Sequence, residues 1–374
     1  MERALARSRE GLPDPRGAVR SAGRRIRLMI VDDSTVARAV LSRMIESDPA
    51  FEITAVASSA EAAVEALGEC RVDIVILDLE MPGAGGLKSI PRILAAAAGA
   101  KVMIVSSLAD DGAEQTVAAL ALGAADTMPK PGTGRFNGKF SEILVGKLKA
   151  LGYASAELPG TASARTGGAP QLLRAMPVDP IDVLAIGAST GGIHALGTLF
   201  HTLPKRIGVP ILVTQHLPIP FMGVFARQLG AVAERDALVA EDGMALVPDR
   251  ILVAPGDAHL TLEPEAGGAI VRLTSGRSSS GCMPSVDPML ASAGAIYGSG
   301  ALGVVLTGMG RDGVEGAARL VACGGSILAQ DEASCAVWGM PRAILEAGLA
   351  SAVLPPDKIA RRIASRTEEP APCK

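Results

Sequence analysis

The stretch RLMIVDDSTVARAVLSRMI at residues 27–45 joins a short apolar run, two aspartates and a segment of mixed apolar and polar residues. The apolar run predicts a buried strand, and the apolar spacing of the following segment predicts a helix. The same order recurs along the first third of the chain. Predicted strands cover residues 27–31, 52–57, 73–77, 101–106 and 127–128, and predicted helices cover 35–45, 59–67, 87–96 and 112–121. This alternation favours a parallel sheet with helices on both faces.

A second series of strands and helices begins at residue 181. Predicted strands cover 183–186, 210–214, 250–253, 269–274, 303–306 and 325–329, and predicted helices cover 192–201, 221–234, 289–297, 313–322 and 336–347. The segment 263–268 resembles a turn, which favours a hairpin around 250–274. Residues 151–178 are rich in Ala, Gly, Ser, Thr and Pro, a composition typical of a linker.

The fold class that follows is α/β, with two doubly wound parallel-sheet domains, the first flavodoxin-like and the second Rossmann-like. We expect a disordered basic extension at 1–25, the first domain at 26–145, a linker at 146–178, the second domain at 179–366 and a tail at 367–374. The strand ends of both domains are expected to carry the chemistry and to face each other across the linker.

Composition excludes several classes of function. A net charge of −3 is too small to favour nucleic acid as a partner. No apolar run reaches the roughly 20 residues that cross a bilayer, so we expect no membrane insertion. We do not expect the Arg-rich start of the chain to be a secretory signal. Five cysteines without CxxC spacing predict reduced thiols and a cytoplasmic protein.

Polar side chains follow successive strands of the first domain. Asp32 and Asp33 come directly after one strand, and Asp78 follows another. Because the carboxyl ends of parallel strands share one edge, these carboxylates are expected to meet and to repel one another unless a cation such as Mg²⁺ lies between them. Ser106 ends the next strand and Lys130 follows the one after it, and both could hold phosphoryl oxygens. Each residue alone has an ordinary interpretation as a helix cap or a surface charge; their coincidence favours a site.

The motifs VDDS at 31–34, LDLEMPG at 77–83, VSS at 105–107 and KP at 130–131 resemble the receiver domain of two-component response regulators. The resemblance implies that Asp78 accepts phosphate from a histidine kinase. It also implies that Mg²⁺ is bound by Asp32, Asp33, Asp78 and the backbone carbonyl of Glu80. Ser106 and Lys130 would sense the phosphoryl group, and the Lys130–Pro131 bond would be cis. Thr127 stands where many receivers have Phe or Tyr, so we expect coupling through the loops alone.

Three chemically distinct residues follow strands of the second domain. Ser189 lies in the turn GASTGG at 187–192, His216 follows the next strand, and Asp312 lies in TGMGRDG at 307–313. Serine, histidine and aspartate at one sheet edge can perform acyl transfer, with the histidine as base and the aspartate orienting it. The Gly-rich turns offer backbone N–H groups for an oxyanion.

Other interpretations of this domain fit less well. The turn at 187–192 lacks the GxGxxG spacing of a dinucleotide loop. His194, His201 and His259 are expected to be surface or packing residues. Because the sequence has no HxxxH or Cys/His motif, we expect no zinc cofactor in the esterase site.

The second domain also resembles a known family. The motifs are IGASTGG at 186–192, TQHLP at 214–218, APGDAHL at 254–260, PSVDPM at 284–289, TGMGRDG at 307–313 and QDEASCAVWGMPRAI at 330–344. They are similar to the catalytic domain of chemotaxis protein-glutamate methylesterases. The resemblance implies a triad of Ser189, His216 and Asp312, with the N–H of Met309 in the oxyanion hole. Cys282 and Met283 stand where these enzymes usually have His-Arg.

The resemblance implies hydrolysis of glutamate methyl esters on methyl-accepting chemotaxis receptors, with deamidation of receptor glutamines by the same chemistry. A chemotaxis histidine kinase would be the phosphodonor. Two alternatives stay open. One is a response regulator with a non-enzymatic output domain, although the second domain lacks a basic recognition helix. The other is an esterase that acts on a different methylated signalling protein.

Overall fold

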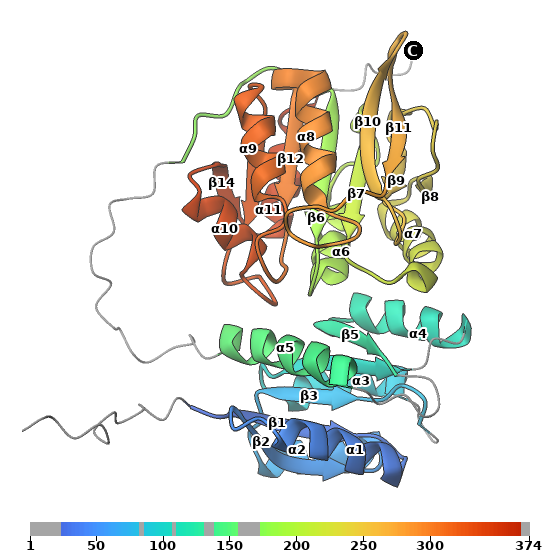
Figure 1. The fold of residues 1–374 in the computed structure, drawn as a ribbon, viewed down its shortest axis with the longest axis vertical. Coiled ribbons are helices and arrows are strands. Elements are labelled where there is room, and N and C mark those ends of the chain that lie inside the picture. Colours follow the sequence, from blue (N-terminus) through green and yellow to red (C-terminus); the bar gives the residue numbers. More distant parts are fainter. Residues whose placement is uncertain (1–23, 82–85, 107–109, 131–137, 156–172, 368–374) are drawn as a thin grey trace, which may run out of the picture.

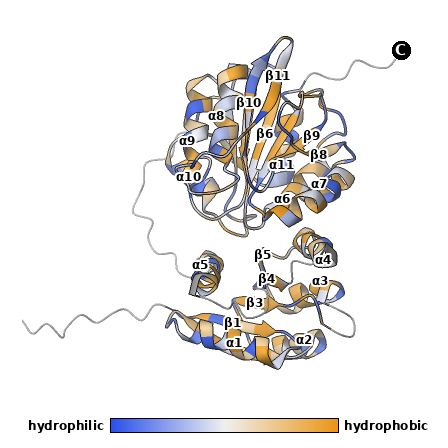
Figure 2. Cartoon of the chain, turned by 45° about the vertical axis from the view of Figure 1, so that its right-hand side comes forward, coloured by the Kyte–Doolittle hydropathy of each residue, from blue (hydrophilic) through white to orange (hydrophobic). Residues whose placement is uncertain are grey.

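The computed structural model describes residues 24–81, 86–106, 110–130, 138–155 and 173–367. These residues form two domains, each built on its own parallel sheet (Figure 1). The strands of both sheets consist mainly of hydrophobic residues, as Figure 2 shows by colour. The predicted α/β class with two doubly wound parallel sheets is therefore confirmed.

The first domain holds a five-stranded sheet in the order β2-β1-β3-β4-β5, the strand order of flavodoxin-like folds. Its strands are β1 (Ile26–Val31), β2 (Phe51–Ala57), β3 (Ile74–Leu77), β4 (Lys101–Ser106) and β5 (Asp126–Pro129). Its helices are α1 (Thr35–Glu46), α2 (Ala60–Glu69), α3 (Gly86–Ala96), α4 (Asp110–Ala121) and α5 (Gly138–Ser155). The hydroxyls of Ser34 and Ser59 accept hydrogen bonds from the first turns of α1 and α2 and so fix where these helices begin.

Helix α5 is absent from the sequence-based assignment, and the expected domain boundary at residue 145 falls inside it. Leu144, Leu148 and Leu151 are fully buried on one face of α5, which ties the helix to the first domain. Gly152 lowers the helix propensity of this segment. A Cβ there would lie 2.6 Å from side-chain atoms of Ile26, so the glycine is what allows α5 to approach β1.

The second domain holds a seven-stranded parallel sheet in the order β14-β13-β12-β6-β7-β9-β8, with a separate antiparallel pair, β10-β11. Its strands are β6 (Val183–Ala188), β7 (Ile211–Gln215), β8 (Ala237–Val239), β9 (Ile251–Val253), β10 (His259–Glu265), β11 (Gly268–Thr274), β12 (Ala301–Val305), β13 (Ser326–Gln330) and β14 (Ala350–Leu354). Its helices are α6 (Gly192–Thr202), α7 (Ile219–Ala233), α8 (Val286–Tyr297), α9 (Val314–Ala322), α10 (Met340–Glu346) and α11 (Pro356–Ala364), with a short 3-10 turn, η1 (Gly298–Gly300). A hairpin does occur in the predicted region, but it pairs β11 with β10, which the sequence pattern did not predict, because the predicted strand 250–253 is β9 of the main sheet. The elements β8, β14 and α11 are also absent from the sequence-based prediction.

The order of strands in the second sheet creates a crevice for a site. The chain runs outward from β6 through β7 on one side and returns through β12 on the other. The loops after β6, β7 and β12 therefore open at neighbouring positions of the same edge, which is where doubly wound sheets bind ligands.

The first domain meets the second with its α4, β5 and α5 side (Figure 1). Helix α4 packs against α6 and α7, and Glu114 of α4 pairs with Arg227 of α7 at 3.0 Å. We expected the strand-end edges of both domains to face each other. That expectation is wrong for the first domain, because its contact surface is this lateral side and not the edge that carries Asp78 and Lys130.

Within the described part of the chain, no helix combines the length and the hydrophobicity that crossing a membrane requires.

Candidate functional site

Ser189 follows the last residue of β6, in a turn that three close approaches hold in place. Its N–H donates to the carbonyl of Thr307 at 3.0 Å, and the Gln215 amide donates to the Ser189 carbonyl at 2.9 Å. A Cβ on Gly308 would lie only 2.6 Å from the Cβ of Ser189. Glycine at this position therefore lets the 307–313 loop lie directly against the serine. Ser189 itself is half-buried.

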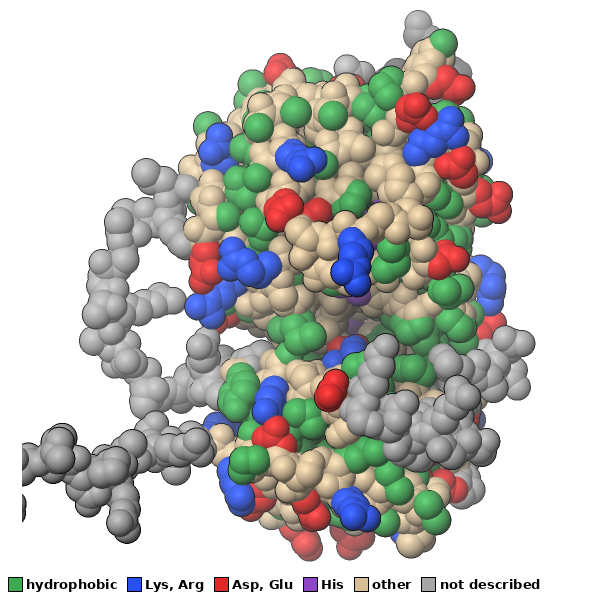
Figure 3. Space-filling model, viewed as in Figure 1, with side chains coloured by type: hydrophobic (Ala, Val, Ile, Leu, Met, Phe, Trp, Pro, Cys, Tyr) green, Lys and Arg blue, Asp and Glu red, His purple; other side chains and the backbone are tan. Residues whose placement is uncertain are grey.

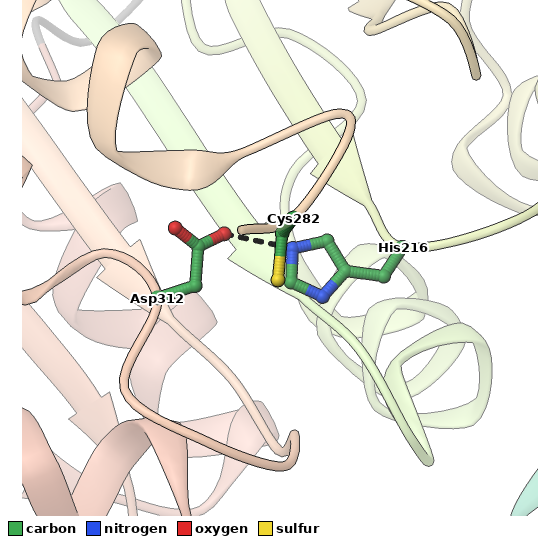
Figure 4. A group of neighbouring side chains, drawn as sticks. All are labelled: His216, Cys282 and Asp312. Atoms are coloured by element: carbon green, nitrogen blue, oxygen red, sulfur yellow. Dashed lines mark hydrogen bonds and ion pairs between the residues drawn. The ribbon is translucent and has the colours of Figure 1, made fainter. Parts of the chain in front are cut away.

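His216 and Asp312 form a hydrogen-bonded pair beside this turn. The distance between His216 Nε2 and Asp312 Oδ2 is 2.8 Å, and the second ring nitrogen points away from the carboxylate (Figure 4). The N–H of His216 donates to the carbonyl of Ala188 at 3.1 Å, which anchors the histidine next to the residue that precedes Ser189. Among the described residues, Ser189 forms no side-chain hydrogen bond to His216. The structure thus pairs two of the three predicted residues and places the third on the adjoining turn.

Asp312 is almost completely buried, and its carboxylate is fully engaged. Oδ1 accepts from the Ser285 hydroxyl at 2.6 Å, and Oδ2 accepts from the Val286 N–H at 2.8 Å. Burial alone raises the pKa of Asp312, but the hydrogen bonds from His216, Ser285 and Val286 outweigh it and hold that pKa well below its usual range. Asp312 is therefore ionised, and the proton between the two side chains belongs to Nε2 of His216.

Ser285 is itself held by His259. The Ser285 N–H donates to His259 Nδ1 at 3.0 Å, and His259 Nε2 lies 2.7 Å from the carbonyl of Gly276. His259 is buried with both ring nitrogens engaged, so the expectation of a surface or packing role for it is incomplete. The sequence contains no local signal for this chain of contacts, because His259, Ser285 and Asp312 come from three separate segments.

Met309 lies on the loop that contacts Ser189. Its side chain is 44% exposed, and its backbone N–H donates to no other group in the described ranges. The same holds for the N–H of Thr190, which follows the serine. Two backbone donors on the turns around Ser189 are thus without an acceptor among the described residues, and the N–H of Met309 is the one that the family resemblance implies for the oxyanion hole.

Cys282 adds a thiol to this group. Its sulfur lies beside the ring of His216, close to the bond with Asp312 (Figure 4). The side chain is half-buried, and burial together with the charge of Asp312 raises the pKa of the thiol. A buried neighbour, Asp287, accepts from the Gly316 N–H at 2.8 Å. Burial and the nearby Asp312 raise the pKa of Asp287 to about 6.

The acidic residues predicted at the sheet edge of the first domain lie close together. Carboxylate oxygens of Asp32, Asp33 and Asp78 lie within 4.8 Å of one another. Lys130 Nζ lies 3.0 Å from Asp32 Oδ2 and 2.9 Å from Asp78 Oδ2, so it neutralises part of their charge. Burial raises the pKa of Asp78. The hydrogen bond and charge of Lys130 lower it but do not cancel the effect of burial. Burial lowers the pKa of Lys130, but the two carboxylates outweigh this and raise it above its ordinary value.

The remaining residues of this site are only partly described. Glu80 is exposed, and its N–H donates to Asp78 Oδ1 at 3.2 Å. Ser106 ends β4, where its backbone pairs with Pro129; its side chain and the Lys130–Pro131 bond lie outside the described residues. Thr127 is buried, and its hydroxyl has no hydrogen-bond partner within the described part of the chain.

The two domains touch at the serine turn itself. The Thr190 hydroxyl donates to Asp126 Oδ2 at 2.8 Å, and the Gly191 N–H donates to the carbonyl of Ala125 at 2.6 Å. Lys147 of α5 lies 2.7 Å from the same Asp126 oxygen. A hollow with a histidine visible in it separates the domains on the face that Figure 3 shows. The first domain therefore holds the two residues that directly follow Ser189.

Comparisons with known proteins cover both domains. Residues 28–135 match the family described as response regulator receiver domain, and residues 184–363 match CheB methylesterase. A protein-glutamate methylesterase/protein-glutamine glutaminase of Paramagnetospirillum magneticum is 39% identical over 361 residues, which is 90% of this chain and 94% of that protein. Another from Caulobacter vibrioides is 41% identical over 350 residues, which is 92% of this chain and 100% of that protein.

Solved structures resemble each domain separately. The crystal structure of the Thermotoga maritima CheB methylesterase catalytic domain is 38% identical and covers 49% of this chain and 97% of that one, with a TM-score of 0.48. The crystal structure of the response regulator domain of Thermotoga maritima CheB is 34% identical and covers 36% of this chain and 100% of that one, with a TM-score of 0.32.

Proposed function

Because the chain belongs to the family of protein-glutamate methylesterases that carry a response-regulator receiver domain, we propose that Ser189, His216 and Asp312 hydrolyse glutamate methyl esters on chemotaxis receptors under the control of Asp78. The protein is a hydrolase, a protein-glutamate methylesterase that is also a protein-glutamine glutaminase. The first domain is its receiver domain, and the second is its catalytic domain.

Acylation begins when the Ser189 hydroxyl attacks the carbonyl carbon of the ester. Since His216 Nε2 faces Asp312, Nδ1 is the nitrogen that takes the serine proton. The ionised Asp312 stabilises the imidazolium that forms. The N–H groups of Met309 and Thr190 donate to the carbonyl oxygen as it becomes negative, which is worth about 3 kcal/mol per donor in comparable sites.

The tetrahedral intermediate then collapses to a glutamyl ester of Ser189. His216 returns its proton to the departing methoxide, so methanol leaves. Water attacks the acyl-enzyme by the same route, which regenerates Ser189 and releases a free glutamate side chain. A receptor glutamine follows the same steps with ammonia as the leaving group. The observation that carries this mechanism is the buried, hydrogen-bonded Asp312 at 2.8 Å from His216.

The receiver domain has the chemistry to hold Mg²⁺. The oxygens of Asp32, Asp33 and Asp78 converge within 4.8 Å, and such a set of carboxylates fits a hard divalent cation. The backbone carbonyl of Glu80 would complete the protein ligands. Mg²⁺ bound there would offset the negative charge of a phosphoryl group on Asp78. Lys130 supplies a second cation next to the same oxygen atoms, and Ser106 would accompany it as the other sensor of the phosphoryl group.

The receiver restrains the catalytic domain before phosphorylation. Asp126 and Ala125 hold Thr190 and Gly191, so a receptor helix cannot approach Ser189 freely. Phosphorylation of Asp78 adds charge next to Lys130, at the far end of the same strand, β5, that begins at Asp126. A shift of β5 would break the contact with Thr190 and release the site. A 100-fold activation requires only about 2.7 kcal/mol of coupling.

The partners follow from the same proposal. The substrate is the cytoplasmic helical region of a methyl-accepting chemotaxis receptor, and the phosphodonor is a chemotaxis histidine kinase. Relatives with this name share about 40% identity over nearly their whole length. We place the enzyme in the cytoplasm, where both partners present these regions.

The test is methanol release from methylated receptor, measured with and without a small phosphodonor. Ser189→Ala and His216→Gln should each remove nearly all release, and Asp312→Asn should lower the rate roughly 10³–10⁴-fold. His201→Gln, on the exposed end of α6, is the control for a neutral histidine change. Near-normal release by a folded Ser189→Ala protein would contradict the acyl-enzyme mechanism and favour a non-enzymatic output. Activity on other methylated proteins but not on receptors would contradict the proposed substrate.

A further inference from the structure

Cys282, His216 and Asp312 form a compact set of metal-ligand atoms in the catalytic domain. A ring nitrogen of His216, Sγ of Cys282 and a carboxylate oxygen of Asp312 all lie within 4.8 Å of one another. Figure 4 shows the sulfur beside the ring, next to the hydrogen bond between the other two residues. The sequence gives no motif for this set, because its members come from three loops that only the fold brings together.

The three donor atoms suit zinc. Imidazole nitrogen, thiolate sulfur and carboxylate oxygen are the ligand types that bind Zn²⁺ in proteins. A thiolate and a carboxylate carry two negative charges, which match the charge of the ion. Sulfur also discriminates against Mg²⁺, which prefers oxygen ligands. Three protein ligands leave a fourth coordination position open for water.

The set is both oriented and reachable. The carboxylate of Asp312 is fixed by the Ser285 hydroxyl at 2.6 Å and the Val286 N–H at 2.8 Å. Such supporting hydrogen bonds orient a ligand before the metal arrives. Cys282 and Asp312 both line a pocket of about 470 Å³ that is open to solvent. An ion can therefore reach the group without unfolding of the loop.

We propose that His216, Cys282 and Asp312 form an inhibitory zinc site and that zinc reversibly switches off the esterase. This inference rests on the proposed catalytic roles of His216 and Asp312. Zinc binds Nε2 of His216 and replaces the proton that this nitrogen shares with Asp312. That proton moves to Nδ1 of the same ring. The Cys282 thiol releases its proton to solvent as the sulfur–zinc bond forms, with no change of oxidation state. His216 then has no free nitrogen to accept the proton of Ser189.

Binding is tested on the full-length protein with Co²⁺ as the probe, because a thiolate bound to cobalt gives a charge-transfer absorption band that carboxylate ligands do not. Excess Mg²⁺ occupies the carboxylates of the receiver domain. The band should form in the wild type and in Cys323→Ser, which removes an exposed thiol elsewhere. It should be absent from Cys282→Ser and His216→Gln. A wild type without the band, or a band of equal strength in Cys282→Ser, overturns the site.

Inhibition is tested by titrating Zn²⁺ into the esterase assay, with each variant compared with its own metal-free rate. Cys282→Ser should need at least about tenfold more zinc for half-inhibition. Removing a residue that only orients a metal ligand already lowers metal affinity by about tenfold, and Cys282 is proposed to be a ligand itself. A chelator followed by Mg²⁺ should restore the wild type. Equal inhibition of Cys282→Ser and wild type overturns the proposal. The cobalt band needs no turnover, so a protein that binds cobalt but hydrolyses no ester would refute the proposed function and not the site.

Discussion

The hydroxyl of Thr190 donates a hydrogen bond to the carboxylate of Asp126, with 2.8 Å between Oγ1 and Oδ2. Thr190 is the residue after the proposed nucleophile, and Asp126 is the first residue of the last strand in the receiver sheet. Lys147 holds the same carboxylate oxygen from α5. One receiver side chain thus connects the α5 helix, the strand that leads to Lys130 and the serine turn of the other domain.

Replacing Asp126 should loosen the receiver from the catalytic domain. Asp126→Ala removes a hydrogen bond to a charged group, a contact worth about 1.5–3 kcal/mol. The rate of methanol release without phosphodonor should therefore rise by about tenfold or more, while the phosphorylated rate should stay the same. The matched control is Asp48→Ala, which removes a similar pair with Lys149 of α5 at 2.6 Å, on a part of the receiver away from the interface. If both variants behave alike, the Asp126 contact does not restrain the enzyme.

Phosphate uptake should depend on Asp78 and not on the neighbouring acidic side chain of Glu80. Asp78→Asn should abolish acid-labile phosphate incorporation and activation by a small phosphodonor. Glu80→Ala should still be phosphorylated, because only its backbone carbonyl is proposed to face Mg²⁺. Incorporation is measured with labelled phosphodonor, with and without Mg²⁺. Equal labelling of Asp78→Asn and wild type would show that another residue accepts the phosphate.

Much of this architecture could be predicted because its signals are local. Apolar runs such as 74–77 specify buried strands, and polar residues directly after them specify the edge where chemistry occurs. Helix α5 escaped prediction because Gly146 and Gly152 interrupt its pattern, and only the packing against Ile26 explains the second glycine. Short strands such as β8 carry too few residues to show a period.

The candidate site also contains residues that the sequence could predict and residues that only the fold brings together. Ser189, His216 and Asp312 could be predicted as candidates because each follows a strand. The supports of Asp312 could not, because the contacts of Ser285 and His259 join segments that are distant in sequence. The thiol of Cys282 is also placed by the fold alone. The contact of the receiver through α4, β5 and α5 depends on how two surfaces complement each other, which no single segment specifies.

Ser285 should act as a positioning residue for the triad. Ser285→Ala leaves Asp312 with the Val286 N–H and His216 as partners, so the carboxylate is held less firmly. We expect kcat to fall about tenfold, which corresponds to about 1.4 kcal/mol. The acidic limb of the pH–rate profile should move to higher pH, because the Ser285 hydroxyl helps to lower the pKa of Asp312, whose carboxylate must stay ionised.

Two variants separate this role from a general loss of stability. Ser285→Thr keeps the hydroxyl and should recover most of the rate. Ser292→Ala, on the same helix α8, removes a hydroxyl that bonds Leu262 and not Asp312, and it should leave the pH profile in place. A pH profile unchanged in Ser285→Ala would leave only the structural role of Ser285 as the cap of α8.

Asp287 should make the folded protein less stable at neutral pH than in mild acid. Burial, with the neighbouring charge of Asp312, raises the pKa of Asp287 to about 6, whereas an unfolded aspartate titrates near 3.9. Between these two values the folded state binds more protons than the unfolded state, so stability decreases as pH rises through this window. Above pH 6 the full cost of the buried charge remains.

Asp287→Asn keeps an oxygen to accept from Gly316 and removes that charge. We therefore expect its Tm to exceed that of the wild type at pH 8, with the difference shrinking toward pH 4.5. Asp257→Asn, which changes an exposed aspartate, should leave the Tm unchanged at both pH values. A difference in Tm that stays the same at both pH values would mean that the carboxyl of Asp287 does not titrate in this window.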